Sequence, residues 1–160
     1  MEEFQAFAAA LEHSGFGAWA RGSSLAYPAA NVIHLLGMVM LVGGIGLLDL
    51  RIAGLFRSLP LAAMSRVLTP FAVAGFILMA PSGLVMFAAD AVPLSKSPTF
   101  LWKISLLAVA VFNASVFQLL WRRWKHEVND NVPLAARLMA VASIGLWLWI
   151  AALGRLIAYS

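Results

Sequence analysis

Four long hydrophobic stretches, separated by short polar or proline-containing segments, dominate the order of apolar and polar residues along the chain. The stretches cover residues 28–50, 64–89, 100–120 and 134–159. At a rise of about 1.5 Å per residue, a helix as long as the first stretch reaches about 34 Å, enough to cross the hydrocarbon core of a bilayer. The pattern therefore predicts an all-α integral membrane protein in which four transmembrane helices form a bundle.

The N-terminal segment, residues 3–25, is amphipathic rather than uniformly apolar. Phe4 and Leu11 lie on one helical face, and several glycines interrupt the segment. We expect one or two short amphipathic helices that lie in the membrane interface and are anchored by Phe16 and Trp19. The whole 160-residue chain is then a single membrane domain.

The composition is that of a membrane protein, with 62% hydrophobic and 11% charged residues. Mean hydropathy is +0.90 and the isoelectric point is about 10.1. The basic residues are scattered at the ends of the spans and form no stripe, so we expect the lipid bilayer as a partner and no nucleic acid. The absence of cysteine excludes disulfides and thiolate-held iron–sulfur clusters within the chain. No nucleophile–base pair or phosphate loop is present, which leaves a membrane redox component as the enzymatic role to consider.

The distribution of Lys and Arg predicts the orientation of the spans. Seven lie on one side of the membrane: Arg51, Arg57, Arg66, Arg122, Arg123, Lys125 and Arg137. Four lie on the other side: Arg21, Lys96, Lys103 and Arg155. The positive-inside rule assigns the first set to the cytoplasm and both termini to the outer side, the periplasm of a bacterium. The acidic N-terminus lacks the basic region of a signal peptide, so we expect an uncleaved, multi-pass protein of the bacterial inner membrane.

His34 is the only histidine in any of the hydrophobic stretches. An ionisable residue within a membrane costs free energy unless it has a partner, and a neutral imidazole is a common ligand of iron, copper and zinc. The predicted topology places four other charged residues in the same outer-leaflet layer: Arg21, Asp90, Lys103 and Arg155.

A b-type haem would suit this layer, because it needs an axial imidazole in a wide apolar crevice and cations near its two propionates. His34 would supply the axial nitrogen. The cations would come from Lys103, Arg155 or Arg21. The sequence therefore predicts haem b as the cofactor.

Glycines share a helical stripe with His34. Ala30, His34, Gly37, Leu41 and Gly44 recur at alternating steps of four and three residues. Gly37 and Gly44 would leave room either for a flat macrocycle or for a closely packed helix.

A second axial ligand is less evident. His13 lies on the same side of the membrane as His34, on the polar face of the interfacial segment. His126 lies on the opposite side, too far in depth to share a haem with His34. Met79 and Met86 of the second span are alternatives, and five-coordinate iron is another.

Other interpretations fit the same residues. His34 would also be stable as a buried residue hydrogen-bonded to a backbone carbonyl or to Asn31, and Lys103 and Arg155 would reach the lipid headgroups. Copper is the alternative cofactor, because histidine and thioether ligands suit it. A third alternative is a cofactor-free accessory subunit of a larger membrane complex.

Four short motifs are typical of one group of membrane proteins: His34-Leu-Leu-Gly37, Leu48-Asp49-Leu50-Arg51, Phe100-Leu-Trp-Lys103 and Gly154-Arg155-Leu-Ile-Ala-Tyr159. On these motifs the chain resembles a family of small bacterial four-helix membrane proteins. More distantly it is similar to the CopD membrane domain of copper resistance and to the membrane-bound, haem-associated protoporphyrinogen oxidase. The resemblance implies that His34 is a haem or metal ligand with Lys103 beside it. Those related families often place a second histidine in a later span, where this chain has Asn113.

Two further polar residues lie in the spans. Asn113 is expected to bridge to a neighbouring helix, or to line a quinone or proton path. Asp49 is expected to pair with a cytoplasmic arginine: Arg122, Arg123 or Arg137. Together the sequence predicts a haem-binding electron-transfer protein whose partners include a quinone, a membrane or periplasmic redox protein, and a second copy of this chain.

Overall fold

The computed structural model describes residues 1–124 and 132–157, without the side chains of residues 122–124. The elements within these residues are all α-helices. In chain order they are α1 (Glu2–Glu12), α2 (Gly15–Gly22), α3 (Ala26–Ala53), α4 (Leu61–Ala89), α5 (Ala91–Lys96), α6 (Pro98–Trp124) and α7 (Leu134–Leu156).

Four of these helices, α3, α4, α6 and α7, are long and apolar enough to cross a membrane. Each corresponds to one hydrophobic stretch of the sequence, so the predicted all-α, four-span fold class is confirmed. Pro28 lies in the first turn of α3, where a helix loses no hydrogen bond to the missing N–H of proline. The segment expected to be a plain connection, residues 90–99, contains the short helix α5.

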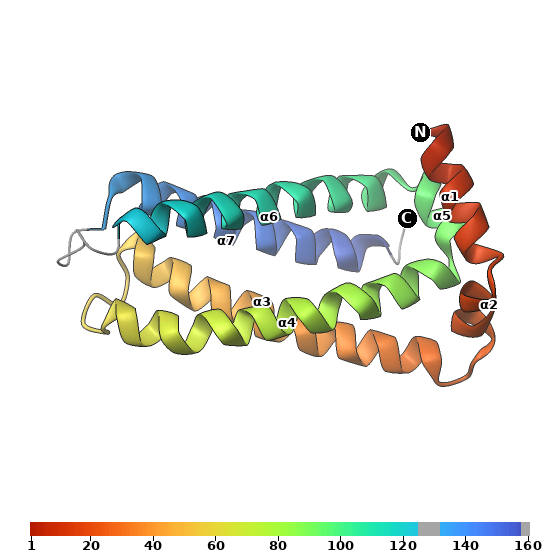
Figure 1. Ribbon diagram of the computed structural model, residues 1–160, viewed down its shortest axis with the longest axis horizontal. Coiled ribbons are helices and arrows are strands. Elements are labelled where there is room, and N and C mark those ends of the chain that lie inside the picture. Colours follow the sequence, from red (N-terminus) through yellow and green to blue (C-terminus); the bar gives the residue numbers. More distant parts are fainter. Residues whose placement is uncertain (125–131, 158–160) are drawn as a thin grey trace.

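The spans are arranged as two pairs. α3 packs on α4, α6 packs on α7, and α7 also packs on α3 (Figure 1). α4 and α6 lie apart over most of their length (Figure 1). They meet near one end, where the stacked rings of Phe87 and Phe100 have centroids 5.2 Å apart. The bundle is therefore tightly closed on the α3 side and loosely closed between α4 and α6.

Glycines bring α3 and α4 into close contact. A Cβ atom placed on Gly75 would lie 2.6 Å from the carbonyl oxygen of Gly37 and 2.6 Å from the backbone nitrogen of Leu41. A Cβ on Gly44 would lie 3.0 Å from the carbonyl oxygen of Leu68. Because these neighbours are backbone atoms, larger residues at Gly37, Gly44 and Gly75 would force the two helices apart.

The short helices α1, α2 and α5 lie across one end of the bundle, which we call the capped end (Figure 1). Arg21 of α2 forms an ion pair with Glu12 of α1 at 3.0 Å and donates to the carbonyl of Ala89 at 3.1 Å. Glu12 also accepts a 2.6 Å hydrogen bond from the backbone N–H of Val92. This backbone hydrogen bond lowers the pKa of Glu12, and the Arg21 guanidinium acts in the same direction.

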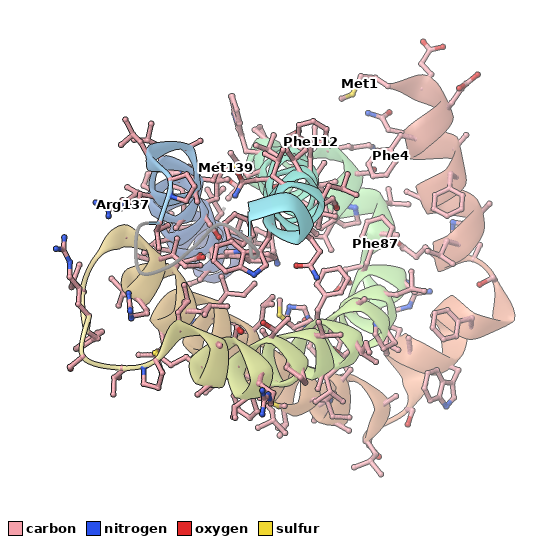
Figure 2. The ribbon with its side chains drawn as sticks, turned by 60° about the vertical axis from the view of Figure 1, so that its left-hand side comes forward. Met1, Phe4, Phe87, Phe112, Arg137 and Met139 are labelled. Atoms are coloured by element: carbon pink, nitrogen blue, oxygen red, sulfur yellow. The ribbon has the colours of Figure 1, made fainter. Side chains whose placement is uncertain are left out.

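Aromatic stacking completes the capped end. The ring of Phe87 on α4 lies between those of Phe4 and Phe100, with a Phe4–Phe87 centroid distance of 6.2 Å. Figure 2 shows Phe4 on the side of α1 that faces Phe87. The stack joins α1, α4 and α6, and so fixes the end of the bundle nearest to His34.

Candidate functional site

His34 lies on α3, eight residues from its start and therefore about 12 Å along the helix from the capped end. The side chain is half-buried and faces α4. Its Nδ1 atom is 3.1 Å from the carbonyl oxygen of Met79 and 3.2 Å from the Oγ of Ser82. The imidazole is thus held by α4 through one of its two nitrogens.

The partners of Nδ1 determine the tautomer of the neutral ring. The carbonyl of Met79 has no proton to donate, so Nδ1 must carry the proton and donate it. The hydroxyl of Ser82 donates to the carbonyl of Leu78 at 2.6 Å, which leaves its oxygen free to accept from His34 as well. We infer that Nε2 of the neutral imidazole carries the free lone pair, which is the form that binds a metal.

The local sequence of α4 explains this position of the ring. A Cβ on Gly83 would lie 3.1 Å from Cε1 of His34 and 3.3 Å from its Nδ1, so the ring would have to shift by a few tenths of an ångström to admit a larger residue there. Met79, Ser82 and Gly83 fall within one turn of α4 and present a carbonyl, a hydroxyl and a flat surface to the ring. The sequence pointed to Met79 only as a thioether ligand and did not identify Ser82 or Gly83, because the role of all three depends on how α3 and α4 meet.

Lys103 approaches His34 from α6. Its side chain is half-buried, and its Nζ would lie 3.3 Å from a Cβ on Gly154 of α7. Both residues lie in the half of the bundle next to the capped end, His34 eight residues into α3 and Lys103 five residues into α6. The structure thus brings together His34 and Lys103, as the sequence predicted for one layer, with Gly154 providing the space for the lysine.

The other predicted cations are placed differently. Arg155 is exposed on the last turn of α7, directly after Gly154. Arg21 is bonded to Glu12 and to the carbonyl of Ala89. The structure therefore gives Arg21 a structural role in joining the cap to the bundle, where the sequence offered it to a haem propionate.

His13, the additional metal ligand proposed from the sequence, also lies outside the spans. His13 is exposed at the C-terminal end of α1. His126 lies outside the described residues. Met79 contributes its carbonyl to His34, and its Cγ would lie 2.9 Å from a Cβ on Gly37, so its side chain packs along α3. Among the residues that the structure describes, no three His, Cys, Asp or Glu side chains form a group that would hold a metal ion.

Gly37 and Gly44 contact a neighbouring helix and do not line a space for a cofactor, the other role considered for them. The backbone of α4 occupies the space beside both glycines, at 2.7 Å and 3.0 Å from added Cβ atoms. The closely packed helix, one of the two alternatives for this stripe, is the one observed. No macrocycle fits between α3 and α4 at these positions, because the two backbones are in contact there.

Two polar residues lie deeper in the bundle. Nδ2 of Asn113 on α6 donates to the carbonyl of Met139 on α7 at 3.2 Å, which confirms the expected bridge between helices (Figure 2 labels Met139). Asp49 is buried on α3, close to Ser143 of α7. Within the described part of the chain it forms no ion pair, so the expected pairing with Arg137 is wrong. The side chains of Arg122 and Arg123 lie outside the described residues.

Comparison with known families gives one match. A family model described as a family of unknown function (DUF6644) matches residues 12–160. Neither a curated protein nor a solved structure matches the chain. The match spans all four transmembrane helices and the region around His34.

Proposed function

The chain belongs to the DUF6644 family, and from the site around His34 we propose that it binds a b-type haem and transfers electrons. Nε2 of His34 would be the axial ligand. A bound haem would supply a one-electron carrier within the outer half of the membrane.

The observation that carries this proposal is the hydrogen bond from His34 Nδ1 to the carbonyl of Met79. A metal-ligating histidine almost always donates its other ring nitrogen to a carbonyl, a carboxylate or water, which orients the ring and raises the basicity of the ligand. The same hydrogen bond is also expected if His34 has only a structural role. It uses one nitrogen, however, and leaves the other with a lone pair inside a membrane span.

The donor set around His34 favours haem over copper. A copper ion needs several protein ligands. The described residues bring no group of three His, Cys, Asp or Glu side chains together, and the side chain of Met79, whose carbonyl contacts His34, packs along α3 beside Gly37. A haem provides four ring nitrogens of its own, so a single imidazole is sufficient to hold it. Lys103, beside Gly154, and Arg155 lie toward the same end of the bundle as His34 and would serve the propionates.

The surroundings of the site fit an electron carrier that works near the outer surface. The distribution of Lys and Arg supports an orientation in a bacterial inner membrane with both termini in the periplasm. In that orientation His34 is about 12 Å from the periplasmic end of α3. The partners would be a quinone and a membrane or periplasmic redox protein. Copies of the chain would also associate with one another.

The test is the visible spectrum of the detergent-purified protein, oxidised and dithionite-reduced, after expression with ample haem. We expect a reduced Soret band and α band in the native protein and their loss in His34→Ala. His13→Ala is the matched control and should keep the spectrum, because His13 is exposed on α1. Adding free imidazole to His34→Gly should restore the bands, which separates loss of a ligand from loss of the fold.

Carbon monoxide identifies the sixth position of the iron. A shift of the reduced Soret band on adding carbon monoxide would indicate an open or weakly held position, as expected if His34 is the only protein ligand. A colourless native protein would overturn the haem proposal. Bound copper in that colourless protein would favour copper handling, and co-purifying subunits without metal would favour an accessory role.

A further inference from the structure

A cavity of about 440 Å³ lies in the half of the bundle away from the capped end. All four spans contribute to its walls, which are mainly apolar. On α3 it extends over Leu41–Ile52, so its nearest wall residue is seven positions, or about 10 Å, from His34. Its volume falls within the range of small-molecule binding pockets in proteins.

Two polar atoms in the walls of this cavity have no hydrogen-bond partner among the described residues. They are Oδ2 of Asp49 on α3 and Nε1 of Trp147 on α7. Asp49 is 8% exposed and Trp147 is 4% exposed. A buried polar atom without a partner costs free energy, so each of these two atoms would gain from a polar group that enters the cavity.

The two atoms form a matched acceptor and donor. Ser143, which lies close to Asp49 and lines the same cavity, is one turn before Trp147 on the same face of α7. Asp49 and Trp147 therefore line the same part of the cavity. The carboxylate oxygen accepts a hydrogen bond and the indole N–H donates one, so a single hydroxyl group would satisfy both.

The cavity opens toward lipid. Its lining includes exposed residues of α4, Val73 and Phe76, and exposed residues of α6, Val111 and Gln118. These are the two spans that lie apart for most of their length (Figure 1). Because exposed faces of membrane-spanning helices contact the bilayer, a ligand reaching this opening comes from the membrane.

We propose that this cavity binds the head group of a membrane-soluble quinol, an aromatic ring with hydroxyl groups and an alkyl or isoprenoid tail. One hydroxyl donates to Oδ2 of Asp49 and accepts from Nε1–H of Trp147, the ring contacts the apolar walls, and the tail leaves between α4 and α6. A phospholipid acyl chain would fill the same space but would leave both polar atoms unpartnered. The proposal rests on the cavity alone, since Asp49 is fifteen residues, or about 22 Å, along α3 from His34.

The experiment is a calorimetric titration with decylubiquinol of the protein held in lipid nanodiscs. It is carried out under argon, and empty nanodiscs give the background. We expect saturable binding to the native protein. Asp49→Leu and Trp147→Phe should each weaken it about tenfold, the usual effect of losing one such hydrogen bond. Trp149→Phe on the same helix is the matched control and should bind normally, because Trp149 is 61% exposed and does not line the cavity. His34→Ala should also bind normally, which separates this site from the proposed haem.

Two further tests do not depend on changing a buried residue. Val73→Trp adds a large side chain at the exposed edge of the opening and should abolish binding while leaving the helices folded, as checked by circular dichroism. The O,O-dimethyl ether of decylubiquinol cannot donate a hydrogen bond and should bind at least tenfold more weakly than the quinol. No saturable binding, equal binding of the dimethyl ether, or unchanged binding by Asp49→Leu and Trp147→Phe would each overturn the proposal. Co-purified phospholipid that decylubiquinol does not displace would indicate that an acyl chain occupies the cavity.

Discussion

Replacing Gly75 by alanine should destabilise the bundle, whereas the same replacement at Gly43 should not. The added Cβ of Gly75→Ala would lie 2.6 Å from the carbonyl oxygen of Gly37 and 2.6 Å from the nitrogen of Leu41. No real Cβ contact is that short, and backbone atoms cannot rotate away, so α3 and α4 must separate along their contact. A Cβ on Gly43 meets nothing within 4 Å.

The magnitude follows from two opposing effects. Overpacking a tight contact costs about 1–3 kcal/mol, and the rigid backbone neighbours place Gly75→Ala near the upper limit. Alanine is favoured over glycine within a helix by about 1 kcal/mol. The net change in the free energy of unfolding is therefore a loss of about 2 kcal/mol for Gly75→Ala and a gain of up to about 1 kcal/mol for Gly43→Ala.

Unfolding in mixed dodecyl maltoside and sodium dodecyl sulfate micelles, followed by circular dichroism, measures both changes. Gly37→Ala provides an internal check, because its Cβ would lie 2.7 Å from the carbonyl oxygen of Gly75. The double variant should lose less than the sum of the two single losses, since one separation of the helices relieves both clashes. A Gly75→Ala protein as stable as Gly43→Ala would refute the close contact between α3 and α4.

The remaining predictions concern the capped end. The backbone hydrogen bond from Val92 lowers the pKa of Glu12, so this carboxylate stabilises the docking of α1 above its unfolded pKa and the effect is lost as the pH falls through the lower, folded value. Protection factors of the α1 amides, which are corrected for the intrinsic exchange rate at each pH, should fall as the pH drops below 4.5, the ordinary pKa of a glutamate carboxyl. In Glu12→Gln they should already be low at pH 7 and change little on acidification. Phe87→Leu removes the stacks on both sides of Phe87 and should lower the stability by about 1–3 kcal/mol, with faster exchange in α1. Phe112→Leu is the control in the same unfolding assay, because Phe112 is 70% exposed and makes none of these stacks; an equal loss there would contradict the role of the stack.

The amino-acid sequence determined the four spans, the amphipathic segment that precedes them and the presence of one histidine within a span. Hydropathy is a property of each segment relative to lipid, so α3, α4, α6 and α7 follow from composition without knowledge of their neighbours. The amide of Asn113 was likewise predictable as a bridge, because a buried amide in a membrane needs a partner on another helix. The short helix α5 was missed, since six residues between two spans carry too little periodicity to reveal it.

Only the tertiary structure decided which surfaces meet. The stripe containing Gly37 permits a cofactor or a helix, and the approach of Gly75 from α4 selects the helix. Arg21 was assigned to a ligand from its side of the membrane, but it pairs with Glu12 because the turn between α1 and α2 brings the two residues together. The tautomer of His34 and the cavity beside Asp49 require the backbone of one helix to lie against a side chain of another. Such contacts depend on interaxial distance and rotation, which the hydropathy of a single segment does not contain.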